Sequence, residues 1–316
     1  MRRNLSVSEV NSPASSTDNG IILSFDLGGS HVAAMAARLN DSFSGVMRSL
    51  ALDEGGSATY LFDRFDEVGR LAISALNVSA PLAGIAVALP GPFDYSNGIS
   101  RLQHKFASWY GINVRRHLAI RFGIEEKDVL FLNDADAFLV GELLDSFAPR
   151  AVGITLGTGI GAAFAIDGRA VPGTKILPNN CDLHLLPWKG STVEEFISTR
   201  GIMRLHEERK GSYRSVKEIA ASSSVDAIAA DTMSVFGQEL GLVIETYLLP
   251  FAPNAIFLGG SISRSQNSFL PAALSVAPIL SDLLKISSHF ERTALIGSIA
   301  DWLQERATLS WSGPLP

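Results

Sequence analysis

Residues 21–30 read IILSFDLGGS, a sequence that indicates how the first sheet of the protein begins. The apolar run from Ile21 to Phe25 is typical of a buried strand, and Gly28 and Gly29 predict a sharp turn directly after it. Two further short strands are predicted at 32–39 and 45–50. The chain therefore opens with an antiparallel hairpin sheet.

Helices and strands alternate after this opening sheet. The apolar spacing predicts a helix at 60–77, strands at 84–89 and 129–132, and a helix at 135–147. Open α/β sheets place their ligands at the carboxyl ends of strands. Asn133 and Asp134 follow the strand at 129–132, so they occupy a position suited to catalysis.

The second half of the chain repeats the opening theme. Strands are predicted at 152–156 and 162–166 on either side of a glycine turn. The sequence TVEE at 192–195 is typical of a capping box, with Thr192 and Glu195 in the capping positions, and predicts the start of a long helix. The remaining predictions are a helical stretch at 225–249, a strand at 255–258 and a helix at 292–306. The two glycine-hairpin blocks suggest two related halves.

A chain of 316 residues favours two domains, each large enough to bury its own core, with a ligand cleft between them. The expected division is a disordered tail at 1–19, an N-terminal α/β domain at 20–133 that helix 292–311 completes, and a C-terminal α/β domain at 134–291.

Composition excludes several classes of function. With 18% charged and 47% hydrophobic residues the chain is an ordinary folded protein, and its net charge of −6 argues against a nucleic-acid partner. No membrane span is predicted, because Glu245 and Pro250 interrupt the richest apolar stretch. Cys181 is the only cysteine, which excludes an intrachain disulfide and a thiolate cluster for zinc. We expect a cytoplasmic protein, since the N-terminus lacks the apolar stretch of a signal peptide.

Two glycine loops indicate phosphate binding. Asp26 comes just before Gly28 and Gly29, whose backbone N–H groups can approach an anion while the carboxylate holds Mg²⁺, directly or through water. The second loop, LGTGIG at 156–161, lies between two predicted strands and can wrap phosphate oxygens with amides. Taken alone, the first loop could be an ordinary tight turn. The second loop favours the functional interpretation.

Asp134 is the candidate general base for phosphoryl transfer, since an attacking hydroxyl must lose its proton. Asn133 could bind a neighbouring hydroxyl. Both residue types also cap helices well, so these two residues could simply begin the helix at 135, and the two roles can coexist. Gly259 and Gly260 would let adenine approach the backbone, or could form a tight turn. The stretch 180–184 supplies too few ligands for a zinc site.

These motifs, in this order, resemble those of the ROK family (repressors, open reading frames and sugar kinases) of the actin-like ATPase superfamily. The resemblance covers roughly residues 21–263. It implies an α/β fold of two actin-like ATPase, or ribonuclease H-like, domains, with ATP and Mg²⁺ as cofactors. By position it implies Asp134 as catalytic base and Asn133 as sugar ligand. The implied cofactor-binding residues are Asp26, Gly28, Gly29, Ser30, Thr158, Gly159, Gly259 and Gly260.

The chain departs from the family pattern where the sugar binds. His31 occupies a position where the family often has lysine, the zinc-binding cysteines are absent, and the asparagine that usually helps hold the sugar is missing near Lys105. The Glu-x-Gly-His segment is altered: Asp182 takes the place of its glutamate, and His184 lies near its histidine position. This pattern resembles the zinc-free members of the family, which include relatives of polyphosphate glucokinases.

The resulting hypothesis is a kinase that transfers the γ-phosphoryl of ATP to a hydroxyl of a hexose, such as the 6-OH of glucose, and acts as a homodimer. A sugar-responsive repressor is a rival, but the residues before Ile21 are too few for a helix-turn-helix. A sugar-binding regulatory protein with a decayed active site and a polyphosphate-dependent glucokinase remain as alternatives.

Overall fold

A computed structural model describes residues 20–209, 212–287 and 292–310. The chain forms two compact units: unit 1 comprises the residues up to Asp145 and those from Arg292 onward, and unit 2 runs from Ser146 to Glu291. The division thus follows Asp145, beyond the boundary after residue 133 that the sequence led us to expect. The expected tail at 1–19 lies outside the described residues.

Unit 1 is built on a five-stranded sheet with the order β3-β2-β1-β4-β7. Its main strands are β1 (Ile21–Leu27), β2 (His31–Arg38), β3 (Asp41–Ala51), β4 (Leu82–Leu89) and β7 (Val129–Asn133). A small hairpin pairs β5 (Phe93–Asp94) with β6 (Ile99–Ser100). The helices are α1 (Ala58–Leu76), α2 (Val114–Phe122), α3 (Asp134–Asp145) and α10 (Thr293–Ser310).

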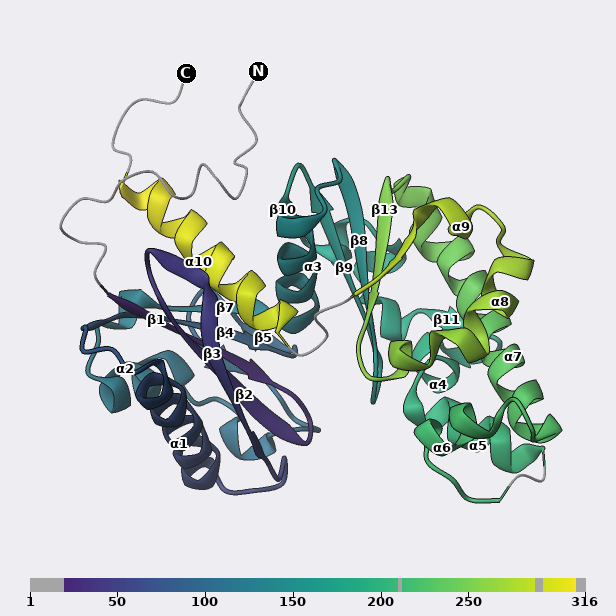
Figure 1. Cartoon of the computed structure of the whole chain (residues 1–316), viewed down its shortest axis with the longest axis horizontal. Coiled ribbons are helices and arrows are strands. Elements are labelled where there is room, and N and C mark those ends of the chain that lie inside the picture. The colour runs from purple at the N-terminus through teal and green to yellow at the C-terminus, as the bar shows by residue number, and fades with distance from the viewer. Residues whose placement is uncertain (1–19, 210–211, 288–291, 311–316) are drawn as a thin grey trace. The chain divides into compact units, whose positions relative to one another are not determined.

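Helices cover both faces of this sheet (Figure 1). On one face Phe25 packs against Phe65 of α1, with 4.9 Å between ring centroids. On the other face Ile22 belongs to a cluster with Leu295 and Trp302 of α10. The last helix of the chain therefore completes the core of the first unit.

Unit 2 repeats the pattern of unit 1. Its sheet has the order β10-β9-β8-β13-β14, and in both sheets a run of antiparallel strands continues into parallel ones. The strands are β8 (Arg150–Leu156), β9 (Ile160–Ile166), β10 (Arg169–Val171), β13 (Ala255–Gly259) and β14 (Leu284–Ile286), with a hairpin of β11 (Pro187–Trp188) and β12 (Ser191–Thr192). The helices are α4 (Val193–Phe196), α5 (Thr199–Glu208), α6 (Val216–Ser222), α7 (Ala227–Val243), α8 (Gln266–Val276) and α9 (Leu280–Leu283).

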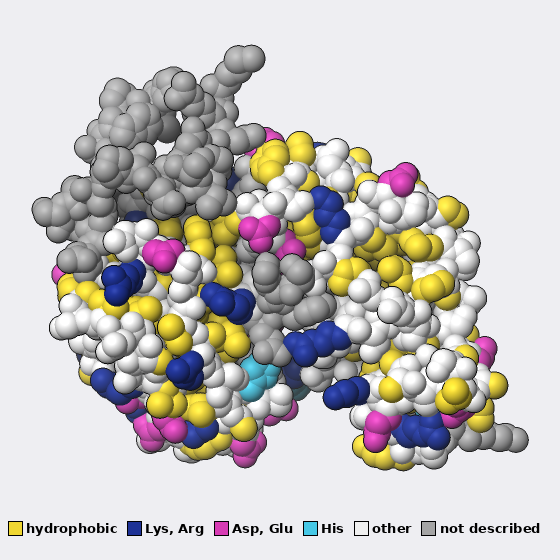
Figure 2. Space-filling view, viewed as in Figure 1, with side chains coloured by type: hydrophobic (Ala, Val, Ile, Leu, Met, Phe, Trp, Pro, Cys, Tyr) yellow, Lys and Arg dark blue, Asp and Glu magenta, His cyan; other side chains and the backbone are white. Residues whose placement is uncertain are grey.

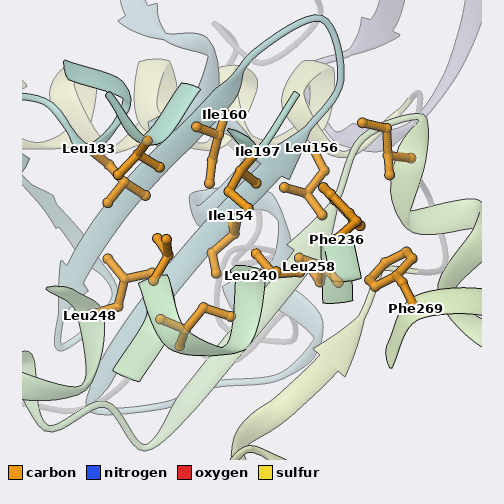
Figure 3. Packing of buried hydrophobic residues seen from close by; sticks show 14 of the residues in the cluster. Ile154, Leu156, Ile160, Leu183, Ile197, Phe236, Leu240, Leu248, Leu258 and Phe269 are labelled. Atoms are coloured by element: carbon orange, nitrogen blue, oxygen red, sulfur yellow. The ribbon is translucent and has the colours of Figure 1, made fainter. Parts of the chain in front are cut away.

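The core of unit 2 lies between its sheet and α7 (Figure 3). Ile154 and Leu258 from the strands meet Phe236 and Leu240 from α7. The helical stretch from Ala227 to Phe251 is long and apolar enough to span a membrane by length and composition alone, but 56% of its most apolar window is buried. A helix that is mostly buried in this way is typical of a protein core.

The predicted capping box at 192–195 is wrong. Thr192 makes no side-chain cap, and α4 is a single turn. The carboxylate of Glu195 instead forms ion pairs with Arg200 and Arg204 of the following helix, so it does not accept a hydrogen bond from the N–H of Thr192. The longer helix, α5, is capped by Ser198, whose Oγ accepts a hydrogen bond of 3.0 Å from the N–H of Gly201.

Candidate active site

The carboxyl end of β1 places Asp26 beside the first glycine turn. Side chains alternate along a strand, so Asp26 lies on the same face of β1 as Ile22 and Ser24. That face carries α10, where Ser24 Oγ donates a hydrogen bond of 2.9 Å to the carbonyl of Leu295. Asp26 is partly buried there.

Asn133 and Asp134 stand at the junction of β7 and α3. Asn133 Oδ1 accepts a hydrogen bond of 3.0 Å from the N–H of Ala135, so it caps the helix. Its Nδ2 donates to the hydroxyl of Tyr95 at 3.1 Å, and that hydroxyl donates to the carbonyl of Leu89 at 3.2 Å. Asp134 Oδ1 also accepts from Ala135 N at 2.9 Å. The cap and the tyrosine together fix the start of α3 against the end of β4.

The pKa values of Asp26 and Asp134 are both raised. Burial, followed by the negative charge of Asp134, raises the pKa of Asp26 from 3.8 to about 7. Burial likewise raises the pKa of Asp134, while the hydrogen bond from Ala135 and the positive charge of Lys105 act in the lowering direction. A carboxylate with a raised pKa is a better proton acceptor, which suits Asp134 to general-base chemistry.

The first glycine turn is tight. The N–H of Gly28 donates to the carbonyl of His31 at 3.0 Å, which closes the turn between β1 and β2. A Cβ built on Gly28 would lie 2.8 Å from the imidazole of His31, so a larger residue would displace that ring. Ser30 is exposed on the turn, and its carbonyl accepts from Leu52 N at 2.9 Å.

The second glycine turn joins β8 and β9, as the sequence predicts. The N–H of Gly157 donates to the carbonyl of Gly159 at 2.9 Å, and Thr158 is exposed at the tip. The carbonyl of Gly157 accepts two hydrogen bonds of 2.9 Å from Thr199, through its N–H and its Oγ1. A Cβ on Gly159 would overlap the carboxylate of Glu194. The start of α5 thus holds the turn, and Glu194 lies against it.

Gly260 has a structural role at the end of β13. Its φ is +87°, and a Cβ at this position would overlap the backbone of Leu156. The strand that ends at Gly259 can therefore approach the end of β8 closely. This approach brings Ser261 beside the second turn, where its Oγ would be 3.8 Å from a Cβ on Gly157.

The predicted site residues fall into two groups. Unit 1 contains Asp26, Gly28, Gly29, Ser30, Asn133 and Asp134, and unit 2 contains Thr158, Gly159, Asp182, His184, Gly259 and Gly260. Within unit 2, Asp182 is exposed and His184 is half-buried, on either side of the buried Leu183. Neither side chain makes a hydrogen bond with the described part of the chain.

Sequence reasoning did not select three charged residues near the glycine turns. Glu54 and Lys105 flank Gly29, and Glu194 lies against Gly159. Their positions depend on contacts between segments far apart in the chain, so local patterns gave no signal for them.

The carboxylates of unit 1 fit a magnesium ion. Mg²⁺ prefers oxygen ligands and commonly takes one or two carboxylates together with water and phosphate oxygens. The residues with described positions include no group of three or more His, Cys, Asp or Glu side chains that could hold a metal. Asp26 would hold such an ion together with phosphate oxygens and water.

A model of the ROK family matches residues 23–292. The chain belongs to the ROK family. The predicted membership and the two-domain actin-like ATPase fold are thereby confirmed.

Two similar curated proteins are kinases. A glucokinase of Thermotoga maritima is 29% identical over 240 residues, covering 63% of this chain and 71% of the relative. An N-acetyl-D-glucosamine kinase of Haemophilus influenzae is 27% identical over 186 residues, covering 51% of this chain and 60% of the relative.

Solved structures share the fold. The ROK hexokinase of Thermus thermophilus has a TM-score of 0.71 at 18% identity, covering 91% of this chain and 99% of that one. A ROK glucokinase of Streptomyces griseus, in complex with glucose and AMPPNP, has a TM-score of 0.69 at 16% identity, covering 90% and 100%.

Proposed function

We propose that this protein is an ATP-dependent carbohydrate kinase. The observation that carries the proposal is the position of Asp134, a partly buried carboxylate with a raised pKa at the carboxyl end of β7. Its negative charge acts on Asp26, which precedes the first glycine turn. The glucokinase and N-acetyl-D-glucosamine kinase relatives support the same reaction class.

In the proposed step, Asp134 accepts the proton of the attacking sugar hydroxyl. The hydroxyl oxygen forms a bond to the γ-phosphorus of ATP as the bond from that phosphorus to the bridging oxygen of ADP breaks. The products are ADP and a sugar phosphate. Asn133, held by Tyr95 and by the helix cap, orients the acceptor next to the base.

Asp26 would hold the magnesium ion of the nucleotide, directly or through water. The ion would neutralise negative charge on the phosphates. The N–H groups of Gly29 and Ser30 in unit 1, and of Thr158 and Gly159 in unit 2, are suited to phosphate oxygens. Gly28, whose own N–H closes the turn, would let a phosphate approach the backbone. We assign Gly259 and Gly260 to the adenosine side, in addition to the structural role of Gly260.

The acceptor in this proposal is a hexose or a derivative such as glucose or N-acetylglucosamine, phosphorylated on its 6-hydroxyl. Asp182 and His184 are the proposed further sugar ligands, because both carry polar groups that the described part of the chain leaves without a hydrogen bond. Their segment differs most from the family pattern, so it is the part expected to set sugar preference.

One assay tests the proposal. ADP release is measured with purified protein, MgATP and a panel of hexoses and amino sugars, and each product is identified by NMR. We expect turnover with at least one sugar and phosphate on O6. Sugar binding without ADP release from any member of the panel would contradict the proposal and favour a regulatory protein. Replacing ATP by polyphosphate on the same sugar identifies the donor.

We propose a cytoplasmic homodimer that does not bind nucleic acid. On the face that Figure 2 shows, basic and acidic side chains of the described residues are interspersed, without a continuous basic area. Light scattering tests the dimer, and a mass equal to one chain of 33.8 kDa would contradict it.

A further inference from the structure

Two charged side chains from distant segments flank the first glycine turn. A Cβ built on Gly29 would lie 3.3 Å from Glu54 Oε2 and 3.9 Å from Lys105 Nζ. The ammonium group of Lys105 is therefore adjacent to the turn that we assign to phosphate.

The position of Lys105 is fixed by its neighbours in the chain. Phe106 and Trp109 are fully buried, and the N–H of Phe106 donates to the carbonyl of Glu54 at 3.2 Å. Ser108 Oγ donates to the carbonyl of Gly56 at 2.8 Å. The segment that contains Lys105 is thus attached to the loop before α1, which holds the backbone of Lys105 within reach of the turn.

The charge of Lys105 is available to a ligand. Lys105 is half-buried and acts electrostatically on Asp134, yet no ion pair of 4.0 Å or less involves it within residues 20–209, 212–287 and 292–310. The other charged groups identified around the turn are the carboxyl groups of Asp26, Glu54 and Asp134. These carboxylates repel a phosphate that binds at the turn, and a positive charge beside the turn offsets that repulsion.

Building on the proposed kinase function, we propose that the Lys105 ammonium binds a non-bridging oxygen of the phosphoryl group during its transfer at the Gly28–Gly29 turn. Negative charge on these oxygens persists through the loose transition state of phosphoryl transfer. A fixed cation next to them stabilises that state and holds the phosphorus near the acceptor oxygen.

The test compares Lys105→Met and Lys105→Arg with a matched control, Lys127→Met. Lys127 is an exposed lysine of unit 1 that precedes β7, at the opposite end of this strand from Asp134. We expect Lys105→Met to lower kcat by about 10²-fold while the sugar KM changes by less than about threefold, with partial recovery in Lys105→Arg. A kcat for Lys105→Met within about threefold of the control would overturn the proposal.

A binding measurement separates this proposal from the kinase assignment. Isothermal titration calorimetry with inorganic triphosphate and Mg²⁺ should show about tenfold weaker binding to Lys105→Met than to Lys127→Met. If the unmodified protein turns over no sugar, the kinase assignment fails and calorimetry alone decides the role of Lys105. Equal affinities in the two variants would then overturn it. Circular dichroism confirms that each variant is folded.

Discussion

Asn133 and Asp134 combine helix capping with the catalytic role that we propose for Asp134. Asn133 Oδ1 satisfies the first free N–H groups of α3, with a second, longer contact of 3.4 Å to Asp136 N. The cap fixes the backbone that carries Asp134. The two interpretations that the sequence left open for this pair are therefore compatible.

Asp134→Asn is expected to lower kcat by roughly 10²- to 10⁴-fold, because the amide cannot accept the hydroxyl proton. The fold should persist, since Asn keeps an oxygen for the N–H of Ala135. Steady-state kinetics measure the effect, with Asp41→Asn, at an exposed aspartate of unit 1, as the control. Near-normal turnover in Asp134→Asn would refute the assignment of the base.

Asp26 makes the stability of unit 1 depend on pH. Its pKa is about 7 in the folded protein against 3.8 for the ordinary group, so the folded state binds its proton more tightly. This contribution is complete below about pH 4 and is lost as pH rises through 7. The unmodified protein should therefore lose up to about 4 kcal/mol of unfolding free energy between pH 4 and pH 8, and Asp26→Asn should not show this loss.

Hydrogen exchange of the β1 amides measures this free energy for unit 1 alone. A difference between Asp26→Asn and the unmodified protein that does not change with pH would show that Asp26 is not the titrating group. The stabilised variant should also lose activity, because it lacks the carboxylate assigned to magnesium.

Local patterns selected Asp26, Asn133 and Asp134 as candidates, because each of these residues lies at or just beyond the carboxyl end of a strongly apolar strand. They could not identify Lys105. It lies in an irregular segment, and its position next to Gly29 depends on the burial of Phe106 and Trp109.

At the scale of elements, the crossing of α3 and α10 depends on two glycines. A Cβ on Gly141 would overlap the carbonyl of Thr293, and a Cβ on Gly297 would overlap that of Ala137. The two helices can therefore approach each other more closely than side chains would allow. This contact explains why α3 belongs to unit 1 and not to the unit that follows it.

Gly297→Ala should lower the unfolding free energy of unit 1 by about 1 to 3 kcal/mol, because the methyl group has no space against the backbone of α3. Helix propensity alone predicts the opposite sign, a gain of about 1 kcal/mol. Thermal unfolding followed by calorimetry distinguishes the two. An unchanged or higher Tm would mean that the crossing is looser than described.

Element boundaries were predictable where one apolar period dominates, as in β1, β4 and α1. The capping box predicted at 192–195 does not form, because the carboxylate of Glu195 pairs with Arg200 and Arg204 instead. A capping box does occur at Ser215 and Glu218, each side chain bonding the backbone N–H of the other.

At the scale of the whole molecule, unit 1 is discontinuous in sequence and unit 2 is continuous. Ile22, Met35 and Ala86 of the unit 1 sheet are covered by α10. The indole of Trp302 also donates to the carbonyl of Asp128 at 3.0 Å. Unit 1 therefore depends on a helix, α10, that follows unit 2 in the sequence.

Deleting residues 292–316 should destabilise unit 1 and leave unit 2 folded. The deletion exposes an apolar face of the first sheet and removes the partner of α3. Hydrogen exchange resolved by peptide measures both units, with β1 and β8 as reporters. Trp302→Ala provides a milder variant, for which we expect a partial loss confined to unit 1. Equal protection of β1 with and without α10 would contradict this dependence.

The sequence predicted the two-domain architecture, since both halves carry the same strand, glycine turn and strand pattern. It misplaced the boundary, because the contact of Gly141 and Gly297 that assigns α3 to unit 1 joins segments far apart in the chain. The sequence did not predict which sugar is preferred, because the proposed sugar ligands Asp182 and His184 belong to a segment with little regular structure.

The late position of α10 has a consequence during translation. The ribosome synthesises the β1–β7 sheet first, but the helix that covers one face of it is made only after the whole of unit 2. Unit 2 can therefore fold while one face of the first sheet is still uncovered and accessible to chaperones.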